Sequence, residues 1–383
     1  MKAPFTTKPA AGSGNTPAAA AVFALLVFAP ALFFASVIAG REISRFYALA
    51  WALFAGGTAF AIAYTGRVSS WRRLFFSVSA LAFLVHFKLG LLSKALAPSC
   101  LADAPFCHIA LAPYFLNYLR QQYQALVSGG WALWGPLSLG ALWLFVTLAL
   151  GRAWCSWACF YGGIDDGLSA LPKKPLLKID GWALKVRDLP AALLIFLLLV
   201  SLGYALPVYC LWLCPFKLTG SFLDGQGWLR TAQYALMLAA LAALVIAPLL
   251  TRKRFFCSFL CPFAAWQAFW GRLNPFRLSA AADCSGCRSC VAACPMTAIK
   301  CAPGGKAEIL AYCNLCGQCL GACPKRGLRY TVFGLDLPAA GGAFGALFSV
   351  KYFYVFSALT LGAAFSSLWA PAALRDLVKL IWG

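Results

Sequence analysis

Residues 284–295 read CSGCRSCVAACP, and residues 313–324 repeat the pattern as CNLCGQCLGACP. Both stretches have the spacing C-x2-C-x2-C-x3-C-P, which places three cysteines on one tight loop and a fourth at the end of a short helix. Three thiolates on one loop can reach three iron corners of one cubane, and the fourth then points away from it. The two runs therefore predict a bacterial ferredoxin-type module with two [4Fe-4S] clusters.

In modules of this kind, the fourth cysteine of each run ligates the other cluster. Small residues such as Gly286 and Gly317 let backbone amides approach the sulfurs. A pair of zinc ribbons is the alternative, but zinc requires no repeat of this spacing. Cys301 matches neither run and is expected to be an ordinary structural cysteine. The predicted ligands are Cys284, Cys287, Cys290 and Cys323 for the first cluster, and Cys313, Cys316, Cys319 and Cys294 for the second.

The sequence around this module is strongly apolar. Of the 383 residues, 62% are hydrophobic and only 11% are charged, whereas soluble domains have about 25% charged residues. Apolar stretches of about twenty residues are long enough to cross a bilayer, and backbone in lipid must be helical. The predicted fold is therefore an all-α polytopic membrane protein with about seven transmembrane helices and an inserted small α+β ferredoxin module. The expected spans are 20–39, 48–65, 74–97, 131–150, 189–208, 231–250 and 352–371.

This pattern divides the chain into four parts. Residues 1–19, rich in Gly, Ser, Thr, Pro and Ala, are expected to be a disordered leader. The apolar stretch after them is too long for a cleavable signal peptide and is expected to be a retained first span. Residues 20–275 should form a transmembrane helical domain, 276–332 the ferredoxin domain, and 333–383 a C-terminal transmembrane segment.

The net charge of +21 is unevenly distributed. Lys and Arg gather in 66–73, 151–188 and 252–254, whereas 98–130 and 209–230 contain few. By the positive-inside rule, the ferredoxin module should lie on the cytoplasmic face of a bacterial inner membrane that the chain crosses several times. Membrane lipid is then the expected surrounding. No nucleic-acid motif accompanies the positive charge, so a nucleic-acid partner is not expected.

Three C-x3-C pairs lie at predicted span ends. Residues four apart on a helix share a face, so each pair presents two sulfurs together. The inner pairs, Cys155/Cys159 and Cys257/Cys261, could supply four thiolates to a third iron–sulfur centre or to a copper site; buried structural cysteines are the alternative. The pair Cys210/Cys214 is predicted on the outer side with Cys100 and Cys107, where disulfides and a second four-cysteine metal site both stay open.

The two histidines are expected at different depths, His86 within a span and His108 in an outer loop. This separation does not suit a haem held by both. His86 and Lys88 are polar residues within a span, so they could contact a quinol; a lysine that extends to the interface is the alternative.

The segments RAWCSWAC at 152–159 and FFCSFLCPF at 255–263, followed by the two ferredoxin runs, resemble the NapH/NosR/MauN-type membrane polyferredoxins over about 145–330. The resemblance implies membrane-bound electron transfer between a quinol or membrane partner and a redox partner protein, in support of a respiratory reductase or the maturation of a metalloenzyme. Phe160 stands where the family pattern has Pro, and Cys210/Cys214 is an additional pair.

Two other functions compete with this electron conduit. The first is a copper-reducing or metal-handling assembly factor that uses the C-x3-C thiols as ligands. The second is a transporter with a regulatory ferredoxin module, which the short loops and the scarcity of carboxylates within the spans disfavour.

Overall fold

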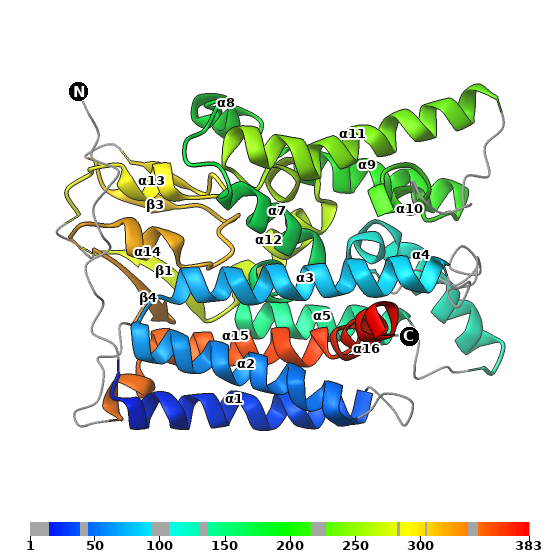
Figure 1. The fold of residues 1–383 in the computed structure, drawn as a ribbon. Coiled ribbons are helices and arrows are strands. Elements are labelled where there is room, and N and C mark those ends of the chain that lie inside the picture. Colours follow the sequence, from blue (N-terminus) through cyan, green and yellow to red (C-terminus); the bar gives the residue numbers. More distant parts are fainter. Residues whose placement is uncertain are drawn as a thin grey trace.

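The computed structural model describes residues 15–38, 45–92, 107–130, 136–216, 227–281, 284–302, 305–325, 327–335 and 344–382. Long apolar helices form the body of the molecule (Figure 1). Among the described residues, four helices are long and apolar enough to cross a membrane: α1 (Pro17–Ile38), α2 (Arg45–Thr65), α3 (Val68–Leu92) and α11 (Trp228–Thr251). A fifth is added if α15 (Val350–Ser366) and α16 (Ala370–Trp382), bent by 49° at their break, form one span. These helices are compatible with a membrane protein.

The predicted number of seven spans is not confirmed. Helices α5 (Pro136–Leu150) and α9 (Leu189–Tyr204) fall on two predicted spans but have only 15 and 16 residues. At 1.5 Å per residue they cover about 24 Å or less, which is short of the hydrocarbon thickness of about 30 Å. Residues 93–97 and 131–135, which belong to two predicted spans, lie outside the described residues.

The predicted leader at 1–19 is wrong at its end. Helix α1 begins at Pro17, and Ala19 is fully buried. The Ala19 backbone N–H donates to Thr16 Oγ1 at 3.3 Å, so Thr16 caps the helix while Pro17 occupies its first turn. Residues 1–14 lie outside the described residues.

The expected outer loop at 98–130 contains a helix. Helix α4 (His108–Val127) buries Ile109, Leu111 and Ala112 along its first turns. It packs against α5 and α9 in the interior of the body. The prediction of an outer loop is therefore wrong over 108–127, because these apolar residues bury one helix face in the body despite Pro113 and Arg120.

Short elements fill the space between the long helices. They are α6 (Ala153–Trp157), α7 (Phe160–Ala170), α8 (Asp180–Lys185), α10 (Val208–Trp212), the π-helix η3 (Phe256–Leu260), α12 (Pro262–Trp270), and the 3-10 turns η4 (Gly271–Leu273) and η5 (Gly345–Phe348). Helix α7 lies so close to α3 that a Cβ at Gly163 would be 2.5 Å from the Ala80 Cβ.

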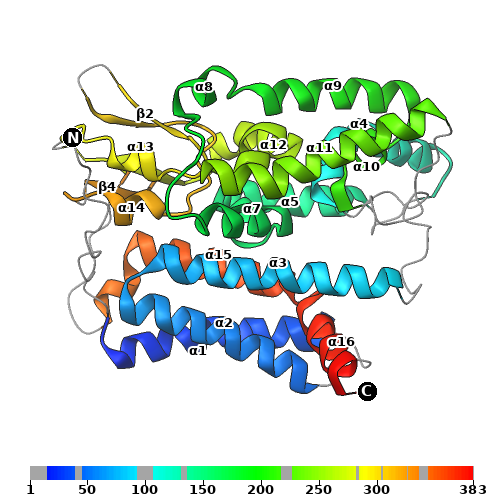
Figure 2. The ribbon, with the colours of Figure 1, turned by 45° about the horizontal axis from the view of Figure 1, so that its top comes forward.

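The cysteine-rich module sits at one end of the long helices in both views (Figures 1 and 2). Strand β1 (Phe276–Ala280) pairs antiparallel with β4 (Leu328–Val332), from Phe276↔Val332 to Ala280↔Leu328. Strand β2 (Ile299–Cys301) pairs with β3 (Ala307–Ile309). Each cysteine run carries a five-residue helix, α13 (Ser289–Ala293) and α14 (Gln318–Ala322). The module docks on α15, where the Tyr330 and Tyr354 rings stack with centroids 5.0 Å apart.

Candidate metal centre

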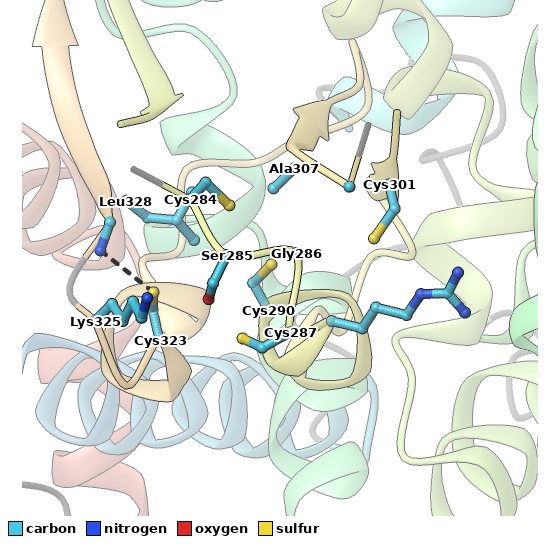
Figure 3. Close-up of a pocket in the computed structure, with 13 residues that line it drawn as sticks. Cys284, Ser285, Gly286, Cys287, Cys290, Cys301, Ala307, Cys323, Lys325 and Leu328 are labelled. Carbon is cyan, nitrogen blue, oxygen red and sulfur yellow. Dashed lines mark hydrogen bonds between the residues drawn. The ribbon is translucent and has the colours of Figure 1, made fainter. Parts of the chain in front are cut away.

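The first predicted ligand set lines a single cavity in the module (Figure 3). Cys284, Cys287 and Cys290 come from the first run, and Cys323 comes from the end of the second. Cys290 lies in α13, and Cys323 directly follows α14. The structure thus brings the last cysteine of one run to the first three cysteines of the other, as the predicted ligand exchange requires.

The surroundings of this cavity suit negatively charged sulfurs. Backbone N–H groups of Gly286 and Ala307 donate to Cys284 and lower the pKa of its thiol. The Gly327 N–H donates to Cys323 Sγ at 3.3 Å. Gly286 has φ +65°, and a Cβ there would lie 2.6 Å from the Gly305 carbonyl oxygen, so the loop depends on glycine at this point. The residues present therefore fit an iron–sulfur cluster held by four thiolates.

The second predicted set is also brought together. Cys294, Cys313, Cys316 and Cys319 interact electrostatically with one another. Burial raises the pKa of Cys294 to about 11 and that of Cys313 to about 12. The Ala298 N–H donates to Cys294 Sγ at 3.3 Å. Since Cys294 belongs to the first run in sequence, the exchange of fourth cysteines is reciprocal.

Cys301 was expected to be an ordinary structural cysteine, yet it lines the first cavity. It sits at the end of β2 opposite Ala307, and this hairpin turns it towards the first cysteine run. No sequence spacing signals this position, because it depends on the register of β2 and β3.

The two inner C-x3-C pairs converge in the interior of the helical body. Cys155 lies in α6 and Cys257 in η3, while Cys159 and Cys261 are the N-cap residues of α7 and α12. All four are buried, and they interact electrostatically as one group. The thiol of Cys155 donates to Gln267 Oε1 at 2.8 Å. The predicted meeting of the two inner pairs is thus present in the structure.

His108 lies at this site. Its Nε2 is 3.0 Å from Cys159 Sγ, and only 1% of the residue is exposed. The ring is enclosed by Trp143, Trp154 and Phe263. Its predicted place in an outer loop is therefore wrong, because α4 places its first residue in the body.

Buried charged side chains, Arg254 and Asp165, lie next to the inner cysteines. The Arg254 Nη2 donates to the Cys155 carbonyl at 2.7 Å and lies 3.4 Å from Cys257 Sγ. Asp165 Oδ2 accepts from the Cys257 N–H at 2.9 Å. Arg254 is fully buried, yet its Nε and Nη1 have no hydrogen-bond partner among the described residues. A buried cation with unused donors fits an anionic group at the four sulfurs.

The inner pairs share their local structure with the ends of the ferredoxin runs. In each case the first cysteine lies in a five-residue helix: Cys155 and Cys257 in the body, and Cys290 and Cys319 in the module. The second cysteine is extended in all four, with φ, ψ of −69°, 119° at Cys159, −86°, 110° at Cys261, −71°, 115° at Cys294 and −81°, 112° at Cys323. The inner pairs therefore present their sulfurs on the backbone that the ferredoxin runs use.

The third pair lies beside Cys107. Cys210 is in α10, which has the same length as α6 and carries its cysteine at the same position. Cys214 Sγ is 3.4 Å from the Tyr161 hydroxyl. Tyr209 interacts electrostatically with Cys214, Cys107 and Cys261 and so links this set to the inner one. Cys100, predicted to share this side, lies outside the described residues.

Across the described ranges, no three His, Cys, Asp or Glu side chains are arranged to hold one ion. The copper-handling alternative therefore gains no support. A cubane spreads its four ligands over four iron corners, so it does not need three ligands gathered around one ion.

Comparison with known proteins adds independent findings. A family model described as "4Fe-4S binding domain" matches residues 131–178, 189–231 and 234–279. Each matched segment contains one C-x3-C pair. The ferredoxin-type protein MauN of Methylobacillus flagellatus, named for methylamine utilization, is 31% identical over 154 residues, or 39% of this chain and 50% of its own. MauN of Paracoccus denitrificans is 29% identical over 176 residues, or 43% of this chain and 56% of its own.

These findings support a relation to the MauN-like polyferredoxins. A further relative is YccM of Escherichia coli, provisionally named an electron transport protein, which is 27% identical over 160 residues, or 40% of this chain and 43% of its own. The chain spans about half the length of these curated relatives. No solved structure matches it.

In this MauN-like chain, the family match identifies an iron–sulfur protein. The match lies on the three C-x3-C segments and ends before Cys284. The family relation thus bears on the membrane-edge pairs, whereas the assignment of the module rests on its own two runs and their geometry.

Proposed function

We propose that this chain is a membrane-bound electron-transfer protein that passes electrons between its ferredoxin module and a membrane partner, with a quinol as the candidate donor. A redox partner protein would exchange electrons with the module, in support of a respiratory reductase or the maturation of a metalloenzyme. The names of the MauN and YccM relatives support a ferredoxin-type electron carrier.

The cofactors we propose are two [4Fe-4S] clusters in the module and a third at the inner cysteines. Such clusters supply one-electron redox chemistry. Cys284, Cys287, Cys290 and Cys323 would hold the first, and Cys294, Cys313, Cys316 and Cys319 the second. Cys155, Cys159, Cys257 and Cys261 would hold the third, supported by their shared burial and by the backbone they have in common with the module. Cys210 and Cys214 have the weakest support as metal ligands.

The observation that carries this proposal is the direct contact between the inner cysteine segments and the second cysteine set. Ser156 Oγ, next to Cys155, donates to the carbonyl of Asn314, next to Cys313, at 2.9 Å. The Arg254 N–H donates to the Pro295 carbonyl at 2.8 Å, beside Cys294. Few covalent and hydrogen bonds thus separate the two sets of sulfurs, which provides a short path for electrons.

We propose that the module faces the cytoplasm from a bacterial inner membrane. Basic side chains support this orientation, because they gather at the module end: Arg73 donates to Gln318 at 2.9 Å, and Lys253 donates to the Cys294 carbonyl at 3.0 Å.

The first test is the iron and acid-labile sulfide content per chain after anaerobic purification, with EPR of the reduced protein. Three cubanes predict about twelve irons, and two predict about eight. The variant C155A/C257A should lose about four irons and leave the spectrum of the two coupled module clusters unchanged. S128A, which removes an exposed hydroxyl that lines neither cavity, is the control and should keep the full iron content. About eight irons in the wild-type protein, unchanged in C155A/C257A, would contradict the third cluster.

Electron transfer is tested separately in proteoliposomes. Quinol should reduce the module clusters in the wild-type protein, and C155A/C257A should slow this reduction strongly while the module keeps its iron. Equal rates in both proteins would refute the inner cysteines as the route. No reduction by quinol in either protein would exclude quinol as the donor.

A further inference from the structure

A second cavity, of about 240 Å³, lies where the ferredoxin module meets the helical body. It is lined by η4, β1 and the segment that leads into Cys313. Cys313 is the one lining residue that also belongs to a proposed cluster ligand set, and the electron-transfer proposal gives the other lining residues no role. The cavity's polar lining residues are Arg152, Arg272, Asn274 and Arg277.

The charge of this lining is entirely positive. It includes three arginines and no Asp or Glu. Arg272 and Arg277 are exposed; Arg277 Nη1 donates to the Gly271 carbonyl at 3.0 Å and its Nη2 donates to the Arg272 carbonyl, which leaves one N–H on each nitrogen for a ligand. Guanidinium groups bind phosphate through paired charge-assisted hydrogen bonds, so the lining suits a phosphate better than a neutral ligand.

Arg152 gives this cavity a buried anchor. The residue is only 2% exposed, and its Nη1 donates to the Tyr312 carbonyl. Its Nε and Nη2 are buried and have no hydrogen-bond partner within the described part of the chain. Unused donors on a buried cation are costly unless an anion meets them, and Arg152 lines the cavity where an anion could do so.

Apolar side chains lie beside the arginines. Phe276 and Leu278 line the cavity and are buried. Phe269 and Leu273, which flank Arg272 along the chain, are 62% and 68% exposed. A ligand with a phosphate and an apolar tail could contact both kinds of surface, whereas a free phosphate would use only the arginines.

We propose that this cavity binds the phosphate of an anionic phospholipid, whose acyl chains run along Phe269 and Leu273. The lipid would fasten the module to the end of the helical body beside Cys313. This site goes beyond the proposed function, because lipid binding does not depend on electron transfer.

The test is native mass spectrometry of the full chain in detergent, titrated with phosphatidylglycerol and, in parallel, with phosphatidylcholine. The variant R272Q/R277Q removes two exposed arginines and leaves Arg152 in its buried contacts. The variant K173Q/K174Q is the matched control, since it removes two exposed charges that do not line the cavity. Iron content is measured for each protein, so a loss of clusters is distinguished from a loss of lipid.

The wild-type protein and the control should bind phosphatidylglycerol in preference to phosphatidylcholine. R272Q/R277Q should bind it about thirtyfold more weakly, which is about 2 kcal/mol at 1.4 kcal/mol per tenfold change. Equal affinity in R272Q/R277Q, or equal binding of the two lipids, would overturn the proposal. Displacement by inorganic phosphate at the same concentration as the lipid would assign the site to a free anion and would also overturn it.

Discussion

The exchange of fourth cysteines between the two runs predicts which of two double variants loses more iron per chain. Cys290 lines the first cavity, whereas Cys294, four residues later, belongs to the second set. The variant C290A/C294A therefore removes one ligand from each cluster, although both cysteines come from one run. The variant C294A/C316A removes two ligands from the second set and none from the first.

Each cubane contains four irons, so C290A/C294A should lose up to about eight irons per chain and C294A/C316A about four. EPR provides the second measurement, because a lone remaining cluster in C294A/C316A should give a spectrum without coupling between clusters. If each run held its own cluster, the order would be the opposite: C290A/C294A would lose about four irons and C294A/C316A about eight. That result would refute the ligand exchange.

Three further predictions concern packing, charge and assembly. In Gly162→Ala the added Cβ would lie 2.5 Å from Arg254 Nη2, so we expect the free energy of unfolding, measured by thermal unfolding, to fall by about 1–3 kcal/mol. Gly203→Ala is the control, because a Cβ there has nothing within 4 Å. An equal loss in Gly203→Ala would contradict the packing argument. Asp166→Asn breaks an ion pair with Arg72 at 2.8 Å in which both side chains are fully buried. It should lower the free energy of unfolding by about 3–5 kcal/mol and shorten the half-life of the folded protein in detergent. An unchanged half-life would contradict a stabilising role of this pair. Thiols must lose their protons to bind a cluster, and the pKa of Cys294 is raised to about 11 while that of Cys284 is lowered. Raising the pH of reconstitution from about 7 to about 9 should therefore speed iron uptake by the second set more than by the first, as followed by EPR; equal acceleration would contradict these pKa directions.

The sequence predicted best what is decided locally. The exchange of Cys294 and Cys323 follows from the run spacing, because each run folds as one loop and one five-residue helix. The convergence of the inner pairs was also predicted, since each pair lies at the end of an apolar stretch. His108 was misplaced because its contact with Cys159 joins residues 51 positions apart. No local pattern contains that contact, which depends on how α4 packs in the body.

The basic residues after α11 show a second limit of sequence reasoning. Arg252, Lys253 and Arg254 were interpreted as an orientation signal, and their place at the module end agrees with that role. Lys253 and Arg254 are nevertheless buried, and each donates to a backbone carbonyl of the cysteine segments. A charge count cannot separate these two roles, because burial of a charged side chain is decided by tertiary packing.

The buried charges connect the cluster sites to the stability of the fold. Arg72, Lys253 and Arg254 are buried near the junction of body and module, together with Asp165 and Asp166. Lys253 also pairs with Asp180 at 3.1 Å. Removing a charge from water is costly unless an opposite charge and hydrogen bonds compensate for it. A cubane with four thiolates carries net negative charge, so a cluster at the inner cysteines would compensate Arg254, whose Nε and Nη1 have no hydrogen-bond partner among the described residues. Arg254, one of the basic residues that orient the chain, would then also stabilise this cluster, and the cluster would in turn stabilise the junction through which electrons pass.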